Sequence, residues 1–302
     1  MIRRFAPLLV RGMALALALA LPCAAAAKSK SRQVRRATPV SEADLAVAYQ
    51  SEEFGSSLSV PKTRAASVMV VDARSGEILY EKNADATRAA ASTQKLLTAL
   101  IVAEEGFLDQ RVRVEKVDML AEPVRLNIKT GETYQRIDLL RALLVKSPND
   151  VARCLARDNA GSIELFARKM NAKARALGAT HSHFVNPNGL PIPDQYSTAR
   201  DLALIARAAY ANPTIRSIVC LPQLVFRYAN GRTRELENTN KVLKRLPYCN
   251  GMKTGYTEAA GHCLIASGTI PGRDVIVVVL GDSKSRVWED ASALLSWGLK
   301  KL

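Results

Sequence analysis

Strand-like patterns near both ends of the chain enclose a long helical stretch, and this order constrains the fold more than any other feature. Residues 65–84 have the pattern strand, turn, strand, with the turn at Arg74-Ser75-Gly76. Strand patterns return after Leu221, in the runs QLVFRYA, GHCLIASGTI and RDVIVVVLGD. This order predicts one α+β (or α/β) domain whose sheet joins both ends of the chain and which contains an inserted helical subdomain.

The middle of the chain carries apolar residues at helical spacing, separated by residues that cap or break helices. The pattern predicts a helix that stops at Gly106, another that ends near Pro148, and two that are broken at Gly161 and closed by Gly178. A further helix runs to Pro213, and the run VWEDASALLSWGLKKL closes the chain as an amphipathic helix.

The first residues have the pattern of an export signal. A basic start is followed by the apolar run MALALALALPCAAAA, which is too short for a spanning helix and offers a small-residue cleavage site before Lys28. Lipidation at Cys23 is a minor alternative, because Pro22 stands where a small residue is expected. We expect a signal peptide at 1–27, a polar linker at 28–60 with at most a frayed helix, a single catalytic domain at 61–302, and a periplasmic location.

The charge of the chain favours anionic partners outside the cytoplasm. The formal net charge is +15, and eight of the positive charges precede residue 37, so residues 37–302 carry +7. A basic surface can bind nucleic acid, but export argues against that partner. Cell-wall polymer or membrane head groups fit better, without a stable membrane anchor.

Cysteine and histidine support no metal site. No C-x-x-C pair exists, and His181 and His183 lack further ligands at useful spacing, so we expect no metal and no cofactor. In an oxidising compartment a disulfide can form, and Cys220 with Cys249 is the candidate pair, because Cys154 and Cys263 lie in segments with buried patterns.

Three short motifs occur in order along the chain. Ser92-Thr93-Gln94-Lys95 begins a strong helix, and the three-residue spacing places Ser92 and Lys95 on one face. Lysine can serve as the base only if its pKa is lowered toward neutrality. Ser147-Pro148-Asn149 follows at a helix end, where it could equally be a turn, and Lys253-Thr254-Gly255 precedes a strand. Ser59-Val60-Pro61-Lys62 has the first spacing without a helix around it.

S-x-x-K, S-x-N and K-T-G in this order form the signature of penicillin-binding proteins and serine β-lactamases. The runs VVDARSGEILYEKNADATRAAASTQKLLTA, HFVNPNGL, STARDLALIARA and GMKTGYTEAAGHCLIAS resemble those of the low-molecular-mass D-alanyl-D-alanine peptidases over about residues 65–300. The resemblance implies the penicilloyl-serine transferase fold, with a five-stranded antiparallel sheet between helices and a site in the cleft beside the helical subdomain.

The resemblance also implies a role for each matching residue. Ser92 corresponds to the acylated nucleophile, Lys95 to its base, Ser147 to a proton relay, and Asn149 to the amide that orients the substrate and Lys95. Lys253 corresponds to the carboxylate anchor. Thr254 contacts the same carboxylate, Gly255 admits the substrate backbone, and the N–H groups of Ser92 and Tyr256 form the oxyanion hole. Pro148 departs from the glycine common in carboxypeptidases, and we expect it to change only the loop shape.

The resemblance leaves several family members open. A class A β-lactamase has an E-x-x-L-N loop between the second and third motifs, and none occurs here. The chain ends 47 residues after Gly255, and VRLN, LENTN, AAGHCLI and EDASALLSW resemble the anchor-less D-alanyl-D-alanine endopeptidases of the penicillin-binding protein 7 type. Such enzymes cleave cross-linked peptidoglycan peptide stems and bind β-lactams as inhibitors. A carboxypeptidase and a non-catalytic peptidoglycan-binding module are the alternatives.

A second Lys-Thr-Gly, at 129–131, precedes Ser147 and leads into a helix. Order and context therefore favour the copy at 253–255 as the functional one.

Overall fold

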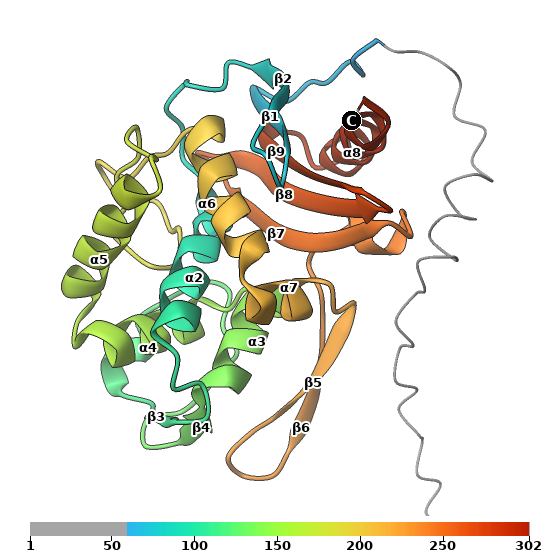
Figure 1. Ribbon diagram of the computed structural model, residues 1–302. Coiled ribbons are helices and arrows are strands. Elements are labelled where there is room, and N and C mark those ends of the chain that lie inside the picture. Colours follow the sequence, from blue (N-terminus) through green and yellow to red (C-terminus); the bar gives the residue numbers. More distant parts are fainter. Residues whose placement is uncertain (1–58, 302) are drawn as a thin grey trace, which may run out of the picture. The chain divides into compact units, whose positions relative to one another are not determined.

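The computed structural model describes residues 59–301, and the expected signal peptide and nearly all of the expected linker lie outside them. Its centre is a five-stranded antiparallel sheet in the order β2-β1-β9-β8-β7 (Figure 1). The sheet therefore joins strands from both ends of the described chain, as the sequence predicts. These strands are β1 (Ser67–Asp72), β2 (Ile78–Lys82), β7 (Cys249–Thr257), β8 (Gly261–Ile270) and β9 (Arg273–Asp282).

Helices fill the middle of the chain and its C-terminal end. The inserted helical part contains α2 (Lys95–Glu105), α3 (Arg136–Lys146), α4 (Asn149–Ala160), α5 (Ile163–Ala176), α6 (Ala199–Ala211) and α7 (Pro213–Val219), and α8 (Val287–Lys301) follows β9. Short 3-10 helices are η1 (Ala91–Gln94), η2 (Lys116–Met119) and η3 (Lys241–Lys244). Small two-stranded sheets pair β3 (Arg111–Arg113) with β4 (Thr133–Gln135), and β5 (Gln223–Arg227) with β6 (Thr233–Glu237).

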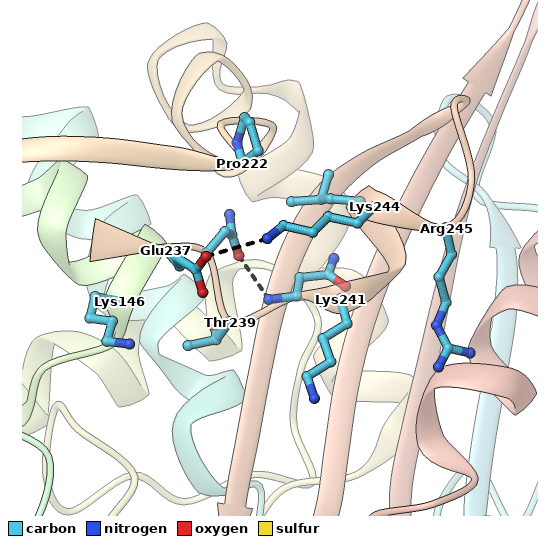
Figure 2. A pocket seen from close by; sticks show the side chains of 10 residues that line it. Lys146, Pro222, Glu237, Thr239, Lys241, Lys244 and Arg245 are labelled. Atoms are coloured by element: carbon cyan, nitrogen blue, oxygen red, sulfur yellow. Dashed lines mark hydrogen bonds and ion pairs between the residues drawn. The ribbon is translucent and has the colours of Figure 1, made fainter. Parts of the chain in front are cut away.

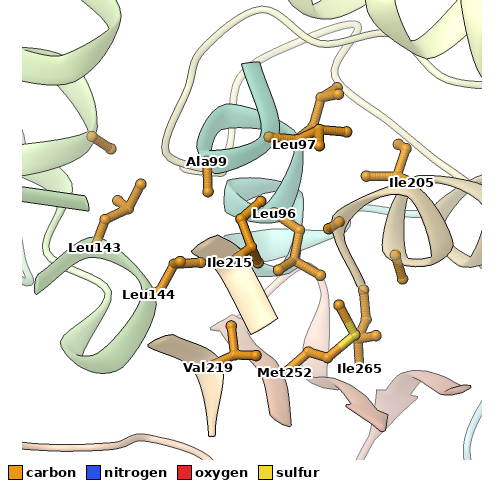
Figure 3. Packing of buried hydrophobic residues seen from close by; sticks show 14 of the residues in the cluster. Leu96, Leu97, Ala99, Leu143, Leu144, Ile205, Ile215, Val219, Met252 and Ile265 are labelled. Carbon is orange, nitrogen blue, oxygen red and sulfur yellow. The ribbon is translucent and has the colours of Figure 1, made fainter. Parts of the chain in front are cut away.

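Two apolar cores lie on the two faces of the large sheet. Ile276, Val278 and Leu280 of β9 face the core shared with the helical part, whereas Val275 and Val277 face the core under α8. Burial on both faces explains why this strand is a continuous apolar run and not an alternating one. Figure 3 shows the first core, where Leu96 and Leu97 of α2 pack near Ile205, Ile215 and Met252.

The expected helix boundaries are confirmed by their caps. Gly106, Gly161 and Gly178 all have positive φ and end their helices, the conformation that glycine adopts at least cost. Thr198 caps α6 by accepting a hydrogen bond from the Asp201 N–H at 3.0 Å. Within residues 59–301, no helix combines the length and the apolar character needed to cross a bilayer.

Some elements were not predicted from the sequence. The Lys253 motif does precede the strand β8, as expected, but it also lies inside β7, whose glycines and Asn250 hide its strand character. The helix α7 was also not predicted; it begins at Pro213, where Asn212 accepts a hydrogen bond from the Ile215 N–H at 3.1 Å. The charged run TRELE forms β6, because it pairs with β5.

The disulfide expected between Cys220 and Cys249 is wrong. All four cysteines in the described part of the chain are free thiols. The Cys220 thiol donates to the Ser217 carbonyl oxygen at 3.5 Å, and the Cys249 thiol donates to the Gly251 carbonyl oxygen at 3.4 Å. Cys154 and Cys263 are buried, as their patterns predict.

Candidate active site

Ser92 and Lys95 lie at the start of α2, where η1 turns directly into the helix. The Lys95 Nζ lies 2.7 Å from the Ser92 Oγ, so the three-residue spacing does bring the two side chains together. Lys95 is fully buried and also hydrogen-bonds to the Asn149 Oδ1 and the Asn188 carbonyl oxygen, each at 2.7 Å. The lysine is therefore fixed beside the hydroxyl by three oxygen atoms.

The segment Asn186–Gly189 covers the start of α2. Side chains of the helix donate to its carbonyl oxygens, with Gln94 Nε2 bonding to Asn186 at 2.6 Å and Thr98 Oγ1 to Pro187 at 2.7 Å. Gly189 has a φ of +82°, and a Cβ at this position would lie 2.0 Å from the Ala91 carbonyl oxygen and 2.9 Å from the Ser92 nitrogen. Only glycine fits here, and its close approach holds the backbone of Ala91 and Ser92 in place.

Ser147-Pro148-Asn149 joins α3 to α4. Ser147 ends α3 in the left-handed conformation with a φ of +66°, and Pro148 is the N-cap of α4. The Ser147 Oγ is buried and has no hydrogen-bond partner within residues 59–301. The Ser147 hydroxyl is thus unpaired in the described structure, while Asn149 contacts Lys95.

The third motif lies on β7, at the edge of the large sheet. A Cβ on Gly255 would lie 2.8 Å from the Ser92 nitrogen, so this strand passes directly over the Ser92 backbone. Thr254 Oγ1 hydrogen-bonds to Thr239 Oγ1 at 2.7 Å, and Lys253 is buried with its Nζ 3.0 Å from the Thr254 carbonyl oxygen. The strand and η1 thus form two walls of one cleft.

Burial controls the charge of both lysines. Desolvation lowers the pKa of Lys95 well below its ordinary value, and the positive charge of Lys253 lowers it further, while Asp150 opposes the shift. Burial alone lowers the pKa of Lys253 to about 7. The lowered pKa favours the neutral amine of Lys95, which is the form that can accept a proton.

A cleft of about 300 Å³ opens above these residues. Ser92, Ser147, Thr254 and Gly255 line it, together with Tyr256, whose exposed ring stacks on His262 at a centroid distance of 4.4 Å. The Ser92 hydroxyl in the cleft, with the buried Lys95 directly behind it and the buried Lys253 on the neighbouring strand, is an arrangement suited to acyl transfer from a substrate with a carboxylate near its scissile bond.

The second S-x-x-K, the second Lys-Thr-Gly and the histidine pair noted in the sequence do not line this cleft. Ser59 and Lys62 are exposed and lie outside any helix or strand. The Lys129-Thr130-Gly131 copy forms an exposed turn that does not line the cleft. His183 lies on a loop, where its Nδ1 is 2.7 Å from the Asp194 carbonyl oxygen.

Sequence reasoning missed four residues that build the cleft. Asn188 accepts a hydrogen bond from Lys95 through its backbone carbonyl, and Gly189 lets the chain pass close to Ala91. The run HFVNPNGL was the only signal in the sequence for either residue. Thr239 bonds to Thr254 from a loop that LENTN marks. The buried Asp150 accepts hydrogen bonds from the N–H groups of Leu126 and Asn127 at 2.9 and 2.8 Å and so holds the loop before α3.

Known proteins share this architecture. The sequence profile of the D-alanyl-D-alanine carboxypeptidase family matches residues 55–284. A D-alanyl-D-alanine carboxypeptidase of Mycobacterium tuberculosis is 35% identical over 80% of this chain and 84% of its own length. A D-alanyl-D-alanine endopeptidase of Escherichia coli is 33% identical over 79% of this chain and 78% of its own length.

Solved structures agree with the sequence comparisons. The crystal structure of a D-alanyl-D-alanine carboxypeptidase from Mycobacterium tuberculosis has a TM-score of 0.77 at 35% identity and covers 82% of this chain and 95% of that one. The DD-transpeptidase of Streptomyces has a TM-score of 0.75 at 28% identity, covering 80% and 99%. The expected penicilloyl-serine transferase fold is confirmed, and the chain belongs to the D-alanyl-D-alanine carboxypeptidase family of serine peptidases, which are penicillin-binding hydrolases.

Proposed function

We propose that this serine D-alanyl-D-alanine peptidase is an endopeptidase that cleaves D-alanyl cross-links of peptidoglycan through an acyl-serine intermediate. One observation carries the chemistry: the buried Lys95 Nζ lies 2.7 Å from the Ser92 Oγ. The endopeptidase preference rests on the sequence runs shared with the anchor-less endopeptidases and on the 33% identity to an enzyme of that name. Export to the periplasm, where this substrate lies, follows from the expected signal at 1–27.

Acylation begins when Ser92 gives its proton to the neutral Lys95. The Oγ then forms a bond to the D-alanyl carbonyl carbon, and the N–H groups of Ser92 and Tyr256 stabilise the negative charge that develops on the carbonyl oxygen. Asn149 holds Lys95 in place through its Oδ1.

Release of the leaving group requires a proton on its amine. The Ser147 hydroxyl, which has no fixed partner in the described structure, passes the proton that Lys95 took from Ser92 to this amine as the carbon–nitrogen bond breaks, and Lys95 is neutral again. Lys253 and Thr254 bind the carboxylate on the leaving residue. Water then attacks the acyl-serine, with Lys95 as the base, and frees Ser92.

β-Lactams are expected to acylate the same serine, because they also present a strained carbonyl and a carboxylate. Labelling with a fluorescent penicillin tests the nucleophile. The wild type should be labelled and Ser92→Ala should not, whereas equal labelling of both would overturn the assignment.

Products distinguish the endopeptidase from the carboxypeptidase. Incubation with purified cross-linked muropeptide dimers should give monomers, measured by chromatography and mass spectrometry. Loss of a terminal D-alanine without monomers would instead establish the carboxypeptidase, and several relatives carry that name.

A further inference from the structure

A second groove has a volume of about 520 Å³, and Figure 2 shows the side chains that line it. Lys146 and Thr239 line both this groove and the catalytic cleft, so the two spaces adjoin at these residues. Lys241 links them again, because it lines the groove while its Nζ lies 5.6 Å from the ring centre of Trp288, which lines the cleft. A substrate bound in the cleft can therefore extend into the groove, whose size falls within the range of ligand sites.

The groove is strongly cationic. Lys146, Lys241, Lys244 and Arg245 line it, against the single carboxylate of Glu237. Lys244 and Glu237 lie 3.5 Å apart, and both are largely exposed, so this pair is weak. Within residues 59–301, no carboxylate pairs with Lys146, Lys241 or Arg245.

The unpaired cations surround the groove from several elements. Lys146 is the last residue of α3 and is half-buried, whereas Lys241 lies on η3 and Arg245 directly follows it. Figure 2 shows Lys146 and Arg245 on opposite sides of the groove, with Thr239 and Lys241 between them. Positive charges that converge on a concave surface concentrate an anionic ligand there.

The position of Thr239 shows which end of the substrate would enter. Its Oγ1 lies 2.7 Å from the Oγ1 of Thr254, which with Lys253 is proposed to bind the carboxylate of the leaving residue. The groove therefore begins at the leaving-group end of the cleft. A terminal D-alanine stops at that carboxylate, but the leaving residue of a cross-link continues into its own peptide stem.

We infer that the groove lined by Lys146, Lys241, Lys244 and Arg245 binds the carboxylate-bearing peptide stem that continues beyond the leaving residue of a cross-linked substrate. This inference rests on the proposed peptidase function and names the surface that distinguishes cross-linked from terminal substrates. Lys244 and Arg245 line the groove but not the catalytic cleft, so they are the charges expected to contact only the extended stem.

The test replaces two groove charges and compares matched substrates. Lys244→Gln/Arg245→Gln should weaken the competition of a purified muropeptide dimer against fluorescent-penicillin acylation by about five- to tenfold, with less effect at high salt. The acylation rate without competitor, and turnover of a monomeric pentapeptide ending in D-Ala-D-Ala, should not change. Glu237→Gln should strengthen the competition about twofold.

Arg227→Gln/Arg234→Gln is the matched control, because it removes two exposed charges of the β5–β6 hairpin that do not line the groove. Equal competition by the dimer in the groove and control variants would overturn the inference. So would a groove variant that loses dimer competition and pentapeptide turnover to the same extent. If the groove variant binds a phosphate polymer differently but the dimer competes as well as before, the inference would also be overturned.

Competition does not require the dimer to be cleaved, so the two proposals can fail separately. A wild type that is acylated by penicillin but leaves dimers intact would refute the endopeptidase function, while the competition would still decide whether the groove binds the stem. If the dimer does not compete with fluorescent penicillin for the wild-type enzyme, the proposed binding of the stem in the groove would be refuted.

Discussion

At the scale of the residue, the site depends on two lysines that burial affects differently. Lys95 is fully enclosed and lies between the Ser92 Oγ and the Asn149 Oδ1. Lys253 is buried on β7, and its pKa is lowered to about 7. The first must lose its proton to act as a base, whereas the second must keep its proton to bind a carboxylate.

Lys95→Arg tests the requirement for a neutral amine. A guanidinium keeps its proton in any protein environment, so it cannot accept the proton of Ser92. The acylation rate with fluorescent penicillin should fall by about 10²- to 10⁴-fold. Circular dichroism and thermal unfolding check that the variant is folded, and a rate within tenfold of the wild type would contradict the role of Lys95 as base.

The pH dependence of kcat/KM should have two limbs. Because its pKa is lowered, Lys95 is neutral above an unusually low pH, so activity should rise as pH rises through that value. Lys253 is charged below about pH 7, so activity should fall as pH rises through it.

Lys253→Arg tests whether Lys253 causes the fall of kcat/KM at higher pH. Arginine stays charged, so the fall near pH 7 should disappear or move to much higher pH, even if the absolute rate is lower. A basic limb at the same pH in this variant would mean that another group causes it.

At the scale of the element, the cleft forms where separate segments meet. The start of α2, the junction of α3 with α4, the edge strand β7 and the segment Asn186–Gly189 each provide one side. Their mutual positions depend on a few close contacts, of which Gly189 against Ala91 is the tightest.

Gly189→Ala should disturb the nucleophile directly. The new Cβ would lie 2.0 Å from the Ala91 carbonyl oxygen, so η1 must move, and acylation should slow by at least about tenfold. The strained φ should also cost about 1–3 kcal/mol of stability.

Gly178→Ala is the control for this prediction. Gly178 has nearly the same φ, +83°, but its nearest neighbour is 3.8 Å from a built Cβ. The Gly178→Ala variant should be less stable than the wild type but should be acylated at the same rate. Equal acylation rates in the two variants would show that the contact with Ala91 does not position Ser92.

Local sequence signals predicted some of these elements better than others. The helices with glycine ends at Gly106 and Gly161, and the apolar strand β9, follow from periodicity and capping. The strand character of β7 depends on its pairing with β8, which no local pattern contains. Asn188 acts through a backbone carbonyl and Thr239 through a distant partner, so the type of neither residue indicates its role.

At the scale of the whole described structure, one sheet separates two cores. The core toward the helical part includes Leu97 and extends to the catalytic residues, whereas the core under α8 includes Leu294 and lies on the other face. Damage to the two cores should therefore have different consequences for activity.

Leu294→Ala tests this separation. Removal of a fully buried leucine should lower the free energy of unfolding by about 2–5 kcal/mol, measured by denaturant titration. The acylation rate of the folded fraction should change much less than with Leu97→Ala, because α8 lines the cleft only at its start, through Val287 and Trp288. Leu97→Ala, directly beside Gln94 and Lys95 on α2, should lower both stability and rate, and a slow but folded Leu294→Ala would refute the separation.

The strand order of the sheet also has a consequence for biosynthesis. β1 leaves the ribosome about 200 positions before its neighbour β9, so one edge of the first hairpin has no partner until that length of chain has been added. The wall that carries Lys253 likewise arrives long after Ser92. A nascent chain therefore carries its nucleophile well before it can react, and it must keep an unpaired strand from aggregating during that interval.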